Sequence, residues 1–177
     1  MKKALAGLFV LLILLVITCN TFEGQKSSGS SAVNEVTAAG VTMQWRVEGS
    51  NLAVTLTAAT TGWVAVGFNP TMAMQGANII IGEVHNNIVT IEDDFGTGPN
   101  DHNADTALGG TDNVINLGGS ETNGVTEIRF KIPLDSGDPN DRPLAIGNTY
   151  KIMLARALVD FLTTQHAARD YAFIKIQ

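Results

Sequence analysis

The chain has 177 residues, of which 45% are hydrophobic, and a formal net charge of −6. With 11 basic residues against 17 acidic ones, it lacks the Lys and Arg excess that binding to nucleic acid requires. A single cysteine excludes an internal disulfide and a multi-cysteine zinc site. The length predicts one domain with short appendages.

The first 18 residues have the pattern of a bacterial export signal. Lys2 and Lys3 precede an apolar run from 4 to 16, which is shorter than the ~20 residues that a membrane-spanning helix needs. The run ends in Val-Ile-Thr-Cys, which resembles the lipobox of bacterial lipoproteins. We therefore expect lipidation of Cys19 and attachment to the cell envelope, on its periplasmic or outer face. The alternative is a plain signal peptide that happens to contain a cysteine.

Residues 19–34 are expected to form a lipid-anchored flexible linker. The stretch 20–32 is rich in Ser and Gly, which bury too little apolar surface to fold. The folded domain is then predicted over 35–177.

A two-residue hydrophobic period dominates from Val41 onward. Val41, Met43 and Trp45 alternate with polar residues, which predicts a half-buried strand. Residues 63–68 are apolar on both faces, as in an interior strand of a sandwich. The other predicted strands are 52–57, 79–84, 88–92, 125–133, 150–155 and 171–176. The pattern predicts an all-β antiparallel sandwich.

Two segments, 94–123 and 156–169, interrupt this period and are predicted to be long loops, which often carry function. Acidic clusters lie at 93–94, 101–105 and 135–141. They could bind calcium, but none has the spacing of an EF-hand loop. Because Asp and Asn are also common turn residues, solvated turns are the favoured interpretation.

Several motifs occur in an order that resembles the DOMON domain family. The segment 62–70 reads Gly-Trp-Val-Ala-Val-Gly-Phe-Asn-Pro, and Met-Gln-Gly-Ala-Asn follows at 74–78. Further matches lie at 92–99, 118–126 and 130–135, and the resemblance extends over 35–177. It implies an immunoglobulin-like sandwich that binds haem or sugar, and it includes the haem-binding cytochrome domain of cellobiose dehydrogenase.

The haem-binding branch of that family implies an axial ligand pair, with Met74 in the loop after the 62–68 strand and His166 in the loop before the last strand. Met72 is the substitute if the loop is shifted. No Cys-x-x-Cys-His is present, so haem b would be held without covalent attachment. The other two histidines are expected elsewhere, with His85 in a solvated hairpin turn and His102 in an acidic loop.

Other residues could surround the haem. The candidate walls, for each of which ordinary core is the favoured interpretation, are Trp63, Phe68, Phe161, Tyr171 and Phe173. Arg156 and Arg169 flank the segment of His166 and could pair with haem propionates, or could simply be exposed to solvent.

These features predict an exported haem protein for electron transfer or redox sensing, with an unidentified redox partner in the envelope. A Met/His pair fills both axial positions, which suits electron transfer rather than oxygen chemistry. No nucleophile–base arrangement, phosphate loop or dinucleotide motif is visible, so the domain is not expected to be an enzyme. The alternatives are a carbohydrate-binding module on the same fold and a copper site built from Met72, Met74 and a histidine.

Overall fold

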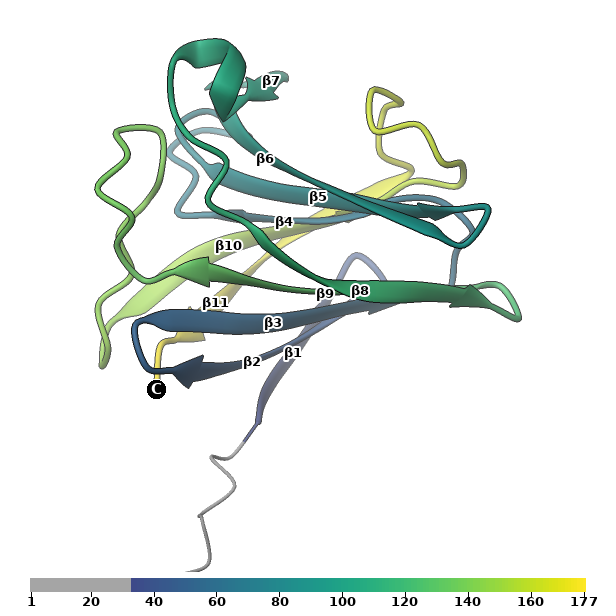
Figure 1. Ribbon diagram of the computed structural model, residues 1–177, viewed down its shortest axis with the longest axis horizontal. Coiled ribbons are helices and arrows are strands. Elements are labelled where there is room, and N and C mark those ends of the chain that lie inside the picture. The colour runs from purple at the N-terminus through teal and green to yellow at the C-terminus, as the bar shows by residue number, and fades with distance from the viewer. Residues whose placement is uncertain (1–32) are drawn as a thin grey trace, which may run out of the picture. The chain divides into compact units, whose positions relative to one another are not determined.

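A computed structural model describes residues 33–177. The predicted signal segment, Cys19 and all of the predicted linker up to residue 32 lie outside the described residues. The described chain forms two antiparallel sheets packed face to face, which confirms the predicted all-β sandwich (Figure 1). No described helix is long and apolar enough to cross a membrane.

The first sheet has five strands in the order β1-β2-β3-β9-β8. Their bounds are β1 Asn34–Ala38, β2 Val41–Glu48, β3 Asn51–Ala58, β8 Ile115–Thr122 and β9 Val125–Pro133. The second sheet has six strands in the order β11-β10-β4-β5-β6-β7. Their bounds are β4 Val64–Phe68, β5 Asn78–His85, β6 Ile88–Gly98, β7 Asp101–Ala104, β10 Thr149–Arg156 and β11 Ala168–Lys175. A 3-10 turn, η1 (Asp105–Leu108), follows β7.

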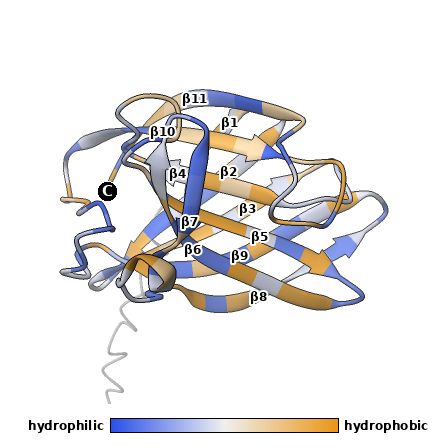
Figure 2. Cartoon of the chain, turned by 90° about the horizontal axis from the view of Figure 1, so that it is seen from above, coloured by the Kyte–Doolittle hydropathy of each residue, from blue (hydrophilic) through white to orange (hydrophobic). Residues whose placement is uncertain are grey.

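The core lies between the two sheets, and the strands are striped by alternating apolar and polar residues (Figure 2). Along β4 the alternation separates two apolar faces. Val64, Val66 and Phe68 pack into the core between the sheets. Trp63 and Ala65 belong to a second, smaller apolar cluster, which lies on the outer face of the six-stranded sheet because neighbouring side chains of a strand point to opposite faces.

The eight predicted strands are all present, but the prediction of one long loop over 94–123 is wrong. That segment holds the end of β6, then β7, η1 and β8. Both β7 and β8 are edge strands whose side chains are largely exposed or half-buried. Edge strands of this kind need no apolar alternation, so the sequence pattern that marks a half-buried strand is missing. The predicted loop over 156–169 is present, but shorter: it runs from 157 to 167.

Candidate functional site

A cavity of about 310 Å³ opens on the outer face of the six-stranded sheet. Its floor comes from β4, β5 and β10, and its walls come from the segments around Met74, Pro99 and His166. Figure 1 shows the β6–β7–η1 region and the β10–β11 loop rising from this sheet on the side away from the other sheet. The lining residues are Trp63, Ala65, Met74, Ile79, Ile81, Pro99, Asn100, His102, Met153, Ala155, Thr163, Thr164, Gln165, His166 and Arg169.

The floor is broad because small side chains occupy its middle. Ala65 on β4 pairs in register with Ile81 on one side and Ala155 on the other. Directly paired residues present their side chains on the same face, so these three form one row across three strands. The next row has Gly67 between Ile79 and Met153. The two alanines at the centre leave a shallow apolar surface onto which a flat ligand could pack.

Met74 lies in the segment between β4 and β5, which several backbone hydrogen bonds hold in place. Its amide donates to the carbonyl of Pro99 at 3.3 Å, and its carbonyl accepts from the amide of Ala77 at 3.1 Å. The Met74 side chain is half-buried and lines the cavity. The bond to Pro99 joins this segment to the β6–β7 turn, which forms another wall.

Gly96 on β6 makes this position of Met74 possible. The amide of Gly76 donates to the carbonyl of Gly96 at 2.7 Å, and the amide of Gly96 donates to the carbonyl of Ala77 at 2.9 Å. A Cβ atom at Gly96 would overlap the carbonyl oxygen of Met74. Glycine is therefore required here for the close approach of two backbones.

His166 is presented by the β10–β11 loop. The indole Nε1 of Trp63 donates to the carbonyl of Thr164 at 3.2 Å, and the amide of Ala167 donates to the carbonyl of Arg156 at 2.8 Å. These bonds tie both flanks of His166 to the sheet. Its imidazole is half-buried and lines the cavity with Met74, so residues 92 positions apart face one space.

The surroundings of His166 favour a neutral imidazole. Burial lowers the pKa of His166, and the nearby charge of Arg169 lowers it further. A neutral imidazole has a free nitrogen lone pair, which is the form that coordinates metals. Arg169 is exposed, pairs in register with Ala155 and lines the cavity.

A second histidine, His102 on β7, also lines the cavity. Its Nδ1 lies 2.5 Å from Oδ2 of Asp94, a carboxylate that is buried on β6. This hydrogen bond is the main cause that raises the pKa of His102. The imidazole is therefore fixed in orientation by a buried carboxylate.

Not every residue expected around the ligand lines the cavity. Phe68 points into the core between the sheets, because β4 alternates and Trp63 and Ala65 take the outer face. Tyr171 lies on the edge strand β11, with its ring under the ammonium of Lys151. Phe161 and Phe173 are 68% and 70% exposed, so they are neither core nor cavity wall.

The remaining candidates also lie elsewhere. Met72 is 58% exposed and does not line the cavity. The Nε of Arg156 donates to the carbonyl of Ala39 at 3.2 Å, away from the cavity. His85 is exposed at the end of β5, next to the β5–β6 turn, and pairs with Asp160 at 3.2 Å. Of the three histidines, two therefore share the cavity.

Comparisons with known proteins agree with this architecture. The family model of the DOMON domain matches residues 38–157. Among solved structures, the cytochrome b domain of pyranose dehydrogenase from Coprinopsis cinerea is similar, with a TM-score of 0.59 and 15% identity over 77% of this chain and 76% of that one. The cytochrome domain of Myriococcum thermophilum cellobiose dehydrogenase is also similar, with a TM-score of 0.60 and 13% identity over 82% of each chain.

Proposed function

Because the chain belongs to the DOMON domain family, we propose that it is a b-type haem-binding domain that transfers electrons, with Met74 and His166 as the axial ligands of the iron. The observation that carries this proposal is the convergence of these two side chains on one cavity with an apolar floor. Two similar folds belong to cytochrome domains, which supports the choice of haem as the ligand.

The donor set of the cavity fits haem. A thioether and a neutral imidazole are established axial donors to haem iron, and the floor around Ala65 and Ala155 would accept the face of a flat macrocycle. Haem bound in this way supplies reversible one-electron chemistry, with a potential raised by the methionine. With Met74 and His166 both bound to the iron, no coordination position would remain for oxygen or substrate, so the site would be suited to electron transfer and not to catalysis.

The remaining cavity residues would orient the macrocycle and protect it from water. Trp63 is buried and closes one side of the floor while its indole fixes the β10–β11 loop. Arg169 is the cationic side chain at the cavity rim, where it would pair with a propionate. Burial lowers the pKa of His166, which favours the unprotonated imidazole that can coordinate iron.

The cellular setting belongs to the same proposal. Lipidation at Cys19 would hold the domain on the bacterial envelope by way of the linker 19–34, with the folded domain over 35–177. An electron carrier in that position would exchange electrons with an envelope redox partner. At the exposed rim of the cavity, where His166 and Arg169 lie, the distance that an electron crosses between haem and partner would be shortest.

The test is optical spectroscopy of the purified domain after addition of haemin, first oxidised and then reduced with dithionite. We expect a sharp Soret band and resolved α and β bands on reduction, which indicate six-coordinate low-spin iron. Met74→Ala and His166→Ala should each remove the low-spin spectrum. Unchanged spectra in both variants would overturn the ligand assignment.

Matched controls come from residues of the same type outside the cavity. Met72→Ala removes a methionine two positions from Met74, and His85→Ala removes a histidine that faces solvent. Both should keep the low-spin spectrum. If Met72→Ala loses it instead, the Met72 thioether is the ligand.

A copper site is the second candidate, because His102 shares the cavity with Met74 and His166. Thioether and imidazole groups suit Cu(I), and the hydrogen bond that the His102 Nδ1–H donates to Asp94 would orient His102 as a ligand. Titration with Cu(I) alone distinguishes the two ligands: tight copper binding that depends on His102, without a low-spin haem spectrum, would favour copper. Sugar binding that survives substitution of Met74 and His166 would favour a carbohydrate-binding module.

A further inference from the structure

One aspartate from each of the three acidic clusters meets the others inside the protein. Asp93 lies on β6, Asp105 begins η1, and Asp141 lies in the segment between β9 and β10. Their exposed fractions are 4%, 1% and 8%. One carboxylate oxygen from each lies within 4.8 Å of the others. The expectation of solvated turns is therefore wrong for these three residues.

Several oxygens of this group have no hydrogen-bond partner. Asp93 accepts at Oδ2 from the amide of Asn113 at 2.9 Å, but its Oδ1 is buried and unpartnered. Both carboxylate oxygens of Asp105 are buried and unpartnered. Asp141 is better satisfied, since it accepts from Ser136 and, at 2.5 Å, from Nδ2 of Asn78. Buried polar atoms without partners are rare in native proteins and call for a specific reason.

Asn78, which is not part of any acidic cluster, adds an independent observation. It is 4% exposed, and its hydrogen bond to Asp141 places its amide against the carboxylate of that residue. The carbonyl Oδ1 of that amide is also buried without a partner. A neutral side-chain oxygen has no protonation by which it could satisfy itself, so it requires a donor or a cation nearby.

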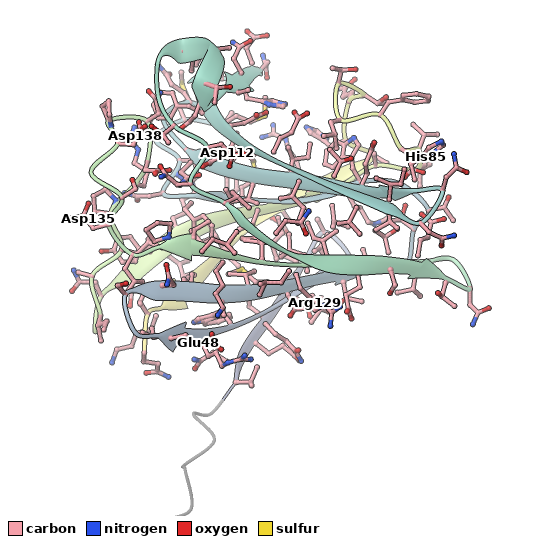
Figure 3. The ribbon with its side chains drawn as sticks, viewed as in Figure 1. Glu48, His85, Asp112, Arg129, Asp135 and Asp138 are labelled. Atoms are coloured by element: carbon pink, nitrogen blue, oxygen red, sulfur yellow. The ribbon has the colours of Figure 1, made fainter. Side chains whose placement is uncertain are left out.

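No positive charge compensates this group within residues 33–177. None of the ion pairs among the described residues involves Asp93, Asp105 or Asp141. The neighbouring Arg142 instead lies over the ring of Phe95 and donates to the carbonyl of Gly76. Figure 3 shows that Asp112 and Asp138 lie at the same end of the sandwich, and their charges act on Asp105 as well.

Gathering these carboxylates is costly without a cation. Burial raises the pKa of Asp93 and of Asp105 to about 7, and the other carboxylates nearby add to the effect. Buried carboxylates are retained in proteins when they are paired or when they coordinate a metal. The arrangement of the oxygens and their burial are the features that distinguish this group from a surface cluster.

We propose that Asp93, Asp105 and Asp141 bind one hard divalent cation, of which calcium suits the site best, with the carbonyl oxygen of Asn78 as a further ligand. The set contains only oxygen donors and no sulfur or imidazole. Such a set favours hard ions over the softer transition-metal ions. Calcium accepts six to eight oxygens in flexible geometry. The proposal is independent of haem binding, because none of these residues lines the haem cavity.

The ion would connect three segments that are distant in sequence. It would bridge β6, the beginning of η1 and the β9–β10 segment. Of these, β6 precedes β7 in the chain and η1 follows it. Because β7 carries His102 and follows the turn at Pro99, the same ion would stabilise one wall of the cavity. Its structural role would therefore be to fix this end of the sandwich.

The test uses the purified full-length chain, without added haemin, after EDTA treatment and dialysis. Titration calorimetry with CaCl₂ alone should give one site per chain, with a Kd in the millimolar range or below. Calcium at about a hundredfold excess over its Kd should raise Tm by roughly 5–10 °C. Magnesium should bind more weakly, since it demands octahedral geometry and keeps its water.

The key variant is Asp105→Asn, which preserves shape and removes one charge. It should raise the Tm of the calcium-free protein, because a buried repulsion is relieved, and it should abolish the calcium-induced shift. The matched control is Asp101→Asn, an exposed carboxylate of β7, which should leave both values unchanged. If Asp105→Asn does not fold, Asp93→Asn replaces it with the same expectations.

Two results would overturn the proposal. One is a wild-type Tm and calorimetric trace that no divalent ion changes at millimolar concentration. The other is a calcium response in Asp105→Asn equal to that of the wild type. Tighter binding of magnesium than of calcium would overturn the assignment of calcium.

Discussion

Ala65 on β4 and Ala155 on β10 are register partners, and both methyl groups form the floor of the cavity. Replacing Ala65 by leucine would fill the space into which a haem face would pack. Overfilling of a packed site costs ~1–3 kcal/mol, so haemin affinity should fall roughly 5- to 150-fold, measured by titration of the Soret band. Ala53→Leu, at a buried alanine on β3 of the other sheet, should leave haemin affinity unchanged. Equal affinities of the wild type and Ala65→Leu would contradict the proposed position of the macrocycle.

The His102–Asp94 pair should stabilise the folded protein more at low pH than at high pH. The hydrogen bond that His102 donates to the carboxylate of Asp94 raises the pKa of His102 above its usual value of 6.5. The protonated imidazole therefore favours the folded state, and this contribution is fully present below about pH 6.5 and lost as pH rises through the raised pKa. In urea unfolding, His102→Gln should cost about 1 kcal/mol more at about pH 5.5 than at about pH 9. His85→Gln, which removes a histidine that faces solvent, is the matched control.

Glu83 on β5 should limit stability at neutral pH. Its Oε2 is buried without a partner, and burial together with the charge of Asp160 raises its pKa above 4.5. Ionisation then opposes folding, with no penalty below about pH 4.5 and a full penalty above the raised pKa. Glu83→Gln should raise Tm at pH 7 and leave it unchanged at about pH 4. A Tm gain of the same size at both pH values would show that the charge is not the cause.

Strands with at least one buried face could be predicted well from the sequence. The alternation of Val41, Met43 and Trp45 predicts β2, and the two-faced apolar run predicts β4, which is interior to its sheet. The edge strands β1, β7 and β8 could not be recognised in the same way. Their side chains face solvent on much of both sides, so no periodic pattern is imposed on them.

The candidate site was predictable only in part, because motifs name residues but not their neighbours in space. Met74 and His166 follow from the family resemblance, and both line the cavity. The contribution of His102 depends on the pairing of β6 with β7, which no local signal shows. The Asp93–Asp105–Asp141 group likewise combines three segments whose proximity only the fold reveals. A signal for His102 was nonetheless present, since it is one of only three histidines in the chain.

Gly96 provides the sharpest test of how the fold positions Met74. Alanine at this position would place a Cβ against the carbonyl of Met74, and the 69–77 segment would have to move away from β6. We expect a stability loss of ~1–3 kcal/mol in urea unfolding and, after addition of haemin, loss of the resolved α and β bands.

Gly98→Ala is the matched control on the same strand. A Cβ there would meet only Asp101 side-chain atoms at 3.6 and 3.9 Å, which are ordinary contact distances. This variant should keep both the stability and the low-spin spectrum. If Gly96→Ala loses stability but keeps the low-spin spectrum, Met74 is not the ligand, because displacement of its backbone would then leave the iron coordination intact. If both variants lose the spectrum, the effect lies in β6 as a whole and not in the contact with Met74.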